Sequence, residues 1–177
     1  MTAIAAICEG GHVYMGGDSA GVGGLNLTVR RDEKVFVNGS TIVGFTTSFR
    51  MGSLLRYSFD PPEHPKGFDD VEYMNTVYVD AIRDCFKVGG FAEAKNGQES
   101  GGTFLVGYRG RLYEIDCDFQ VGIPAANYAA VGCGAQLCLG SLYSTTGQPP
   151  RDRLRQALRA AEQFSAGVRG PFVLREL

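Results

Sequence analysis

The chain opens with the stretch TAIAAICEGGHVYMGGD (residues 2–18), which predicts a β-hairpin. Its first half is a short run of residues that favour strands, and Glu9-Gly10-Gly11 is typical of a tight turn. Residues 12–18 then follow as the second strand. The hairpin therefore begins at a threonine, Thr2, and ends at an aspartate, Asp18.

The rest of the chain alternates between pairs of strands and pairs of helices. Asn38-Gly39 is a strong hairpin signal, and Asp69 with Glu72 forms a capping box at a helix start. Gly-rich residues 19–26 and polar residues 91–102 are expected to be loops. Blocks in this order suit two mostly antiparallel sheets packed face to face, with helices outside, which is an α+β fold. Further strands are expected at residues 34–37, 40–45, 103–108, 112–116, 128–131 and 172–174, and helices at 49–57, 71–85, 136–143 and from 150 onward.

Length and composition indicate one folded domain over residues 1–177. The chain has 44% hydrophobic and 20% charged residues, which excludes a largely disordered chain. Its 25 glycines follow no three-residue period, which excludes collagen. The net charge of −2 gives no indication of nucleic acid or an anionic membrane as a partner. The apolar start lacks a basic segment, so no signal peptide is expected.

Cysteine and histidine usage limits the possible chemistry. The five cysteines lack the paired spacing of a zinc site, and we interpret them as reduced thiols in a cytoplasmic protein. There are two histidines, His12 and His64. A hydrolase with a Cys–His or Ser–His–Asp arrangement would have to use one of them.

Thr2 is a candidate nucleophile that carries its own base. Removal of Met1 would give Thr2 a free α-amine, whose unperturbed pKa lies near 7.7–8.0. That amine can accept the proton of the threonine hydroxyl, which makes a self-contained pair for acyl transfer. If Met1 is retained, this mechanism fails.

Asp18 and Lys34 are candidates for the same site. A buried lysine beside the nucleophile would lower the pKa of the amine and the hydroxyl through its positive charge. Such a lysine needs a carboxylate partner to stay charged and oriented, and Asp18 could be that partner. Taken singly, each is better explained by a surface position.

These residues resemble the catalytic residues of a known family. Thr2, the strand end Gly16-Gly17-Asp18 and Lys34 are similar to the N-terminal threonine, aspartate and lysine of proteasome β subunits, most closely those of HslV-type peptidases. The likeness covers most of the chain. No single motif is specific, but the ordered set is; it continues through residues 42–48, 103–116, 130–134 and 172–177.

The resemblance implies a four-layer αββα sandwich and a threonine-type N-terminal-nucleophile (Ntn) hydrolase that needs no metal or organic cofactor. It places the backbone N–H of Thr47 in the oxyanion hole and implies that the segment around Gly21 and Val22 pairs with substrate backbone. It further implies a homo-oligomeric ring acting on peptides or unfolded proteins, possibly fed by an ATP-dependent unfoldase.

Three positions depart from the family pattern. Thr47 stands where glycine is common, and Cys133 stands where a serine helps to hold the terminal amine. Cys133 can also be interpreted as a plain buried residue. An acidic residue usual before the last strand has no match, and Phe164 or Ser165 falls near its place.

Two other functions are compatible with these departures. One is a catalytically inactive subunit that keeps the sandwich for assembly, and the other is a small-molecule amidohydrolase on the same fold. Glu114, Asp116 and Asp118 suggest either a cation site or the polar end of a hairpin.

Overall fold

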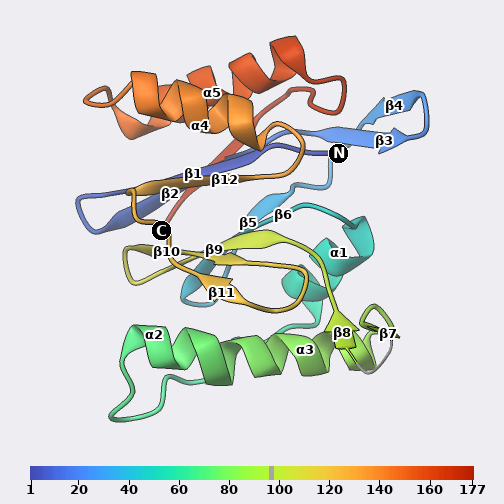
Figure 1. Ribbon diagram of the computed structural model, residues 1–177, viewed down its shortest axis with the longest axis vertical. Helices are drawn as coiled ribbons and strands as arrows, with labels where there is room; N and C mark the ends of the chain where they lie inside the picture. The colour runs from blue at the N-terminus through green and yellow to red at the C-terminus, as the bar shows by residue number, and fades with distance from the viewer. Residues whose placement is uncertain (96–97) are drawn as a thin grey trace.

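Two antiparallel sheets form the centre of the molecule. The computed structural model describes residues 1–95 and 98–177 of the chain (Figure 1). The first sheet has the order β12-β1-β2-β13 and the second the order β11-β10-β9-β6-β5. Their strands are β1 (Ile4–Glu9), β2 (His12–Gly17), β12 (Tyr128–Val131) and β13 (Val173–Glu176) in the first sheet, and β5 (Val35–Asn38), β6 (Thr41–Phe45), β9 (Phe104–Tyr108), β10 (Arg111–Ile115) and β11 (Val121–Gly122) in the second.

Helices cover the outer face of each sheet and complete the four-layer αββα arrangement that the sequence predicts (Figure 1). The first sheet is covered by α4 (Ala135–Ser144) and α5 (Pro150–Phe164). The second is covered by α1 (Phe49–Tyr57), α2 (Asp70–Tyr73), the π-helical turn η1 (Met74–Tyr78) and α3 (Val79–Val88). In the described part of the chain, no helix combines the length and the apolar character needed to cross a membrane.

Strand β1 is apolar from Ile4 to Ile7 because both of its faces are buried there. Ala5 and Ile7 belong to the apolar cluster under α4 and α5, while Ile4 and Ala6 belong to the cluster between the two sheets. Side chains alternate along a strand, so a strand in an inner layer needs apolar residues at every position.

The strand register brings distant segments together at one end of the sandwich. In the first sheet, Ile4 lies opposite both Gly17 and Val131, so Thr2 comes close to Asp18 and to the turn after β12. A Cβ atom on Gly17 would lie 2.8 Å from side-chain atoms of Ile4 and Val35. Glycine therefore permits the close approach of the two sheets beside Lys34.

The predicted helices and hairpins are largely confirmed, with one difference in the second helix. The Asp69 side chain accepts a hydrogen bond from the Glu72 N–H at 2.8 Å, as expected for the cap. The helix after it contains the wide turn η1, which the regular three-to-four spacing does not predict. The turn lets Tyr73, Met74, Tyr78 and Val79 all face the core.

The expected loop at residues 19–26 is wrong. This segment forms β3 (Ala20–Gly23), which pairs with β4 (Asn26–Val29) in a hairpin that projects beside the N-terminus (Figure 1). Its glycines hide the strand pattern, while Gly24 with φ of +59° makes the turn. Short strands β7 (Glu93–Lys95) and β8 (Gln98–Ser100) likewise lie within the expected loop 91–102, in which residues 96–97 are outside the described part.

Candidate active site

Thr2, Asp18 and Lys34 lie together where the two sheets end. Thr2 precedes β1, Asp18 follows β2, and Lys34 immediately precedes β5 of the other sheet. The Lys34 Nζ lies 3.0 Å from the Thr2 Oγ1 and 2.8 Å from the Asp18 Oδ1. All three side chains are buried, with 5%, 1% and 1% of their residue surface exposed, respectively. The structure thus brings the sequence-predicted trio into contact.

The Asp18 side chain accepts hydrogen bonds from four donors. Its Oδ1 accepts from the Ala3 N–H at 3.1 Å as well as from Lys34. Its Oδ2 accepts from the Ala20 N–H at 2.9 Å and from the Arg169 N–H at 3.3 Å. Main-chain donors of this kind stabilise the charged form and fix its orientation. Sequence analysis missed these donors, because a backbone N–H leaves no residue-type signal.

Burial lowers the pKa of Lys34, because a charged ammonium loses its hydration inside the protein. The charge and hydrogen bond of Asp18 oppose this effect and favour the ammonium form. The result is a lysine whose cation depends on one carboxylate partner and donates to the Thr2 hydroxyl. A buried pair of this geometry orients groups more than it stabilises the fold.

The backbone at Thr2 contacts the turn after β12. The Thr2 N–H donates to the Cys133 Sγ at 3.3 Å, and that sulfur lies 3.4 Å from the Ser165 Oγ. Gly132 has φ of +97°, and a Cβ atom there would lie 2.3 Å from the Thr2 carbonyl oxygen. The turn therefore needs glycine at this position to hold the nitrogen of Thr2 against Cys133. Cys133 is exposed rather than buried, so its interpretation as a plain core residue is wrong.

The segment between β6 and α1 forms the opposite wall. The Ser48 N–H donates to the Thr46 carbonyl at 2.6 Å, which places Thr47 at the centre of a γ-turn. Thr47 has φ of +61°, a left-handed conformation that costs a β-branched residue about 1–2 kcal/mol. Among the described residues, no acceptor is bonded to the Thr47 N–H. Its donor is therefore available to a bound group.

These walls enclose a small cavity of about 80 Å³ beside Thr2, and Val22 of β3 lines it. Gly21 does not line this cavity; its carbonyl accepts from the Thr28 hydroxyl of β4 at 3.1 Å. Phe49 also lines the cavity, and its ring carries the Arg30 guanidinium at 3.9 Å from the centroid. Sequence analysis did not single out this aromatic wall.

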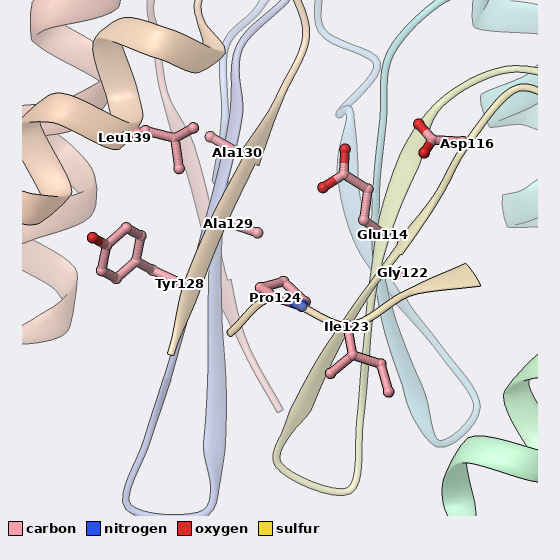
Figure 2. A pocket seen from close by; sticks show the side chains of 9 residues that line it. All are labelled: Glu114, Asp116, Gly122, Ile123, Pro124, Tyr128, Ala129, Ala130 and Leu139. Carbon is pink, nitrogen blue, oxygen red and sulfur yellow. The ribbon is translucent and has the colours of Figure 1, made fainter. Parts of the chain in front are cut away.

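A larger cleft of about 320 Å³ lies elsewhere, between β12 and the β10–β11 edge (Figure 2). Glu114 and Asp116 face it, and burial, followed by the negative charge of Asp116, raises the pKa of Glu114. Within residues 1–95 and 98–177, no three candidate ligand side chains gather as a metal site would require. The cleft is larger than the Thr2 cavity, but a hydroxyl bonded to a buried ammonium is found at Thr2, and this makes Thr2 the stronger candidate.

Comparison of the whole structure with solved structures finds the same fold. BPH from Thiobacillus denitrificans matches with TM-scores of 0.81 (in complex with epoxomicin) and 0.80, at 16% and 17% identity, over 99% of this chain and 97–98% of that chain. HslV from Trypanosoma brucei matches at TM-score 0.69 and 16% identity over 99% of both chains. Anbu, the ancestral beta-subunit from Yersinia bercovieri, matches at TM-score 0.69 and 12% identity, over 99% of this chain and 81% of that one.

The αββα layers therefore form an α+β fold that matches BPH and HslV. It is the fold of the proteasome-type subunits, as seen in HslV, BPH and Anbu. No protein-family model matches the sequence, and no curated protein is similar enough to count as a relative. The likeness to the solved structures lies in the fold, with sequence identity no higher than 17%.

Proposed function

We propose that this protein is a proteasome-like threonine peptidase, with Thr2 as its nucleophile once Met1 is removed. The observation that carries the proposal is the contact of a buried Lys34 ammonium with both the Thr2 hydroxyl and the Asp18 carboxylate. Burial of a lysine to 1% exposure costs free energy. A role for Lys34 in activating Thr2 would account for its burial.

The proposed reaction begins at the α-amine of Thr2, which takes the proton from the Thr2 hydroxyl. The Oγ1 attacks the substrate carbonyl, and the negative oxygen that forms accepts a hydrogen bond from the Thr47 N–H. The protonated amine then gives its proton to the leaving amine, and an ester between substrate and Thr2 remains. Water hydrolyses this ester, which releases the acid and restores the hydroxyl.

Lys34 and Asp18 act on the charge that develops at Thr2. The ammonium at 3.0 Å stabilises negative charge on Oγ1 and lowers the pKa of the neighbouring amine. Asp18 holds Lys34 charged and in place through the hydrogen bond at 2.8 Å. The Thr2 backbone N–H donates to the Cys133 Sγ, and this contact would orient the α-amine that the nitrogen becomes once Met1 is removed.

Substrate would enter beside β3, with Val22 against the acyl group and the backbone of Gly21 and Val22 pairing with peptide. We further propose a cytoplasmic homo-oligomeric ring that takes unfolded protein from an ATP-dependent unfoldase. Its support is the likeness to HslV and the exposed side chains of the β3–β4 hairpin, of which Leu25 is fully exposed and Val29 is 56% exposed. Exposed apolar patches of this kind favour contact with another chain.

Two observations favour other functions on the same fold. A sulfur contacts the Thr2 nitrogen in place of a hydroxyl oxygen, and sulfur is a weak acceptor, which favours an inactive assembly subunit. The cavity measures about 80 Å³ with Met1 among its lining residues, and a site of limited size favours a small-molecule amidohydrolase.

Intact mass measured before and after treatment with a peptide epoxyketone tests the proposal. This reagent offers two electrophilic carbons, one for the hydroxyl and one for the free amine of an N-terminal threonine. We expect loss of Met1 and an increase equal to the whole inhibitor mass, absent in Thr2→Ala. Retained Met1 with no adduct would instead identify the inactive subunit. Adduct formation with cleavage of small amides but not of peptides would identify the amidohydrolase.

A further inference from the structure

We propose that the hydroxyl of Thr47 is a positioning group, which holds the turn that directs the Thr47 N–H into the cavity beside Thr2. The inference rests on the proposed function, because this N–H has a catalytic task only if Thr2 attacks a carbonyl there. The main-chain N–H of Thr47 would stabilise the oxyanion. The side-chain hydroxyl of Thr47 would hold that N–H in position.

The turn needs such a holding contact because its conformation is unfavourable. A γ-turn with positive φ at its centre is the rare and strained form, and Thr47 at +61° is β-branched as well. The bond from the Ser48 N–H to the Thr46 carbonyl closes the turn from inside. It does not fix how the turn sits relative to the second sheet.

Contacts to Thr103, just before β9, supply that connection. The Thr103 N–H donates to the Thr47 Oγ1 at 3.1 Å, and the Thr103 carbonyl accepts from the Thr46 Oγ1 at 2.7 Å. The same carbonyl accepts from the Thr46 N–H at 3.1 Å. Both main-chain groups of Thr103 are therefore bonded to the turn, and the N–H is bonded only through the Thr47 hydroxyl among the described residues.

The neighbouring glycine provides space for this contact. A Cβ atom on Gly102 would lie 2.9 Å from the Thr47 Cβ and 2.6 Å from the Met51 Sδ. The Thr47 side chain thus packs against the backbone of residues 102–103. Its place there explains how a threonine is accommodated where related sequences commonly have glycine.

Three variants separate the hydroxyl from the shape of the side chain. Thr47→Val keeps the branched shape and loses the hydroxyl, whereas Thr47→Ser keeps the hydroxyl. Thr47→Ala also loses the hydroxyl, and because it has no branch at Cβ it is less strained at positive φ than Thr47→Val. Thr146→Val is the matched control, because Thr146 is exposed and bonds only locally, to the Tyr143 carbonyl.

The readouts are kcat and KM on a fluorogenic peptide and the Ki of a peptide boronate, whose oxygen occupies the oxyanion position. We expect Thr47→Val and Thr47→Ala to lower kcat by about tenfold with little change in KM, because misdirecting a donor costs less than deleting it. The boronate Ki should rise by a similar factor. The kcat and boronate Ki of Thr47→Ser should stay within about threefold of the wild-type values. Those of Thr146→Val should equal the wild-type values.

Three outcomes would overturn the proposal. One is wild-type kcat and boronate Ki in Thr47→Ala or in a folded Thr47→Val. The second is an equal loss in Thr47→Ser, which would assign the effect to the methyl group. The third is a wild-type protein that forms no epoxyketone adduct; in that case the proposed function itself fails, and the role of the hydroxyl fails with it. The first two outcomes leave the proposed function intact.

Discussion

Replacing Lys34 with methionine removes the buried cation and keeps a chain of similar length. At 3.0 Å and an effective dielectric constant of about 20, a full charge on the Thr2 oxygen interacts with the ammonium by about 5 kcal/mol. A transition state that carries about half of that charge loses about half of this energy. We therefore expect Lys34→Met to lower kcat on the order of 100-fold.

The same substitution leaves Asp18 charged, buried and without its cation. Breaking a buried ion pair costs about 3–5 kcal/mol, and the three remaining main-chain donors favour the lower end. For a chain of this size, about 3 kcal/mol corresponds to a decrease in Tm of about 6–12 °C. The variant should therefore be assayed at 25 °C, after circular dichroism shows that it is folded.

The assay is hydrolysis of a fluorogenic peptide, with active sites counted by epoxyketone labelling and intact mass. Lys66→Met serves as the matched control, since Lys66 is an exposed lysine in the segment before α2. It should leave kcat and Tm unchanged. A folded Lys34→Met protein that retains more than about a tenth of wild-type kcat would refute the role given to the cation.

Three further predictions concern the surroundings of the site. Gly17→Ala places a Cβ atom 2.8 Å from Ile4 and Val35 atoms and should lower the free energy of unfolding by about 1–3 kcal/mol, measured by urea denaturation; an unchanged midpoint would contradict the close approach. Cys133→Ser should raise kcat, because a hydroxyl is a stronger hydrogen-bonding partner than a thiol, while Cys133→Ala should lower it; the reverse order would exclude a role for this contact. Burial raises the pKa of Glu114 above the ordinary glutamate value. Between these two pKa values the carboxyl binds more protons in the folded state than in the unfolded state. The free energy of unfolding therefore falls as pH rises through that window. Glu114→Gln should therefore raise Tm at pH 7 but not below the ordinary glutamate pKa, and thermal melting that shows an equal gain at both pH values would contradict this reasoning.

Much of the site could be predicted from sequence because its parts lie at strand ends. Thr2 and Asp18 flank the first hairpin and Lys34 immediately precedes β5, and the resemblance of this ordered set to proteasome β subunits predicts that the three act together. The layers follow from the order of strand pairs and helices along the chain. These features depend on local patterns that a single sequence carries.

What could not be predicted depends on contacts between segments distant in the chain. The donors to Asp18 include the Arg169 N–H, which reaches it from the other end of the chain. The contact of Thr47 with Thr103 depends on the pairing of β6 with β9. The β3–β4 hairpin was mistaken for a loop because Gly21 and Gly23 interrupt the alternation that identifies strands.

The buried Asp18–Lys34 ion pair joins two layers that pack against each other through a cluster of apolar side chains. Asp18 belongs to the strand ends of the first sheet and Lys34 to those of the second. A hydrocarbon interface tolerates a small sliding movement, whereas a hydrogen bond of 2.8 Å does not. A small shift of one sheet against the other should therefore lower the catalytic rate while the secondary structure stays unchanged. On gradual heating, activity should disappear before the circular dichroism signal changes.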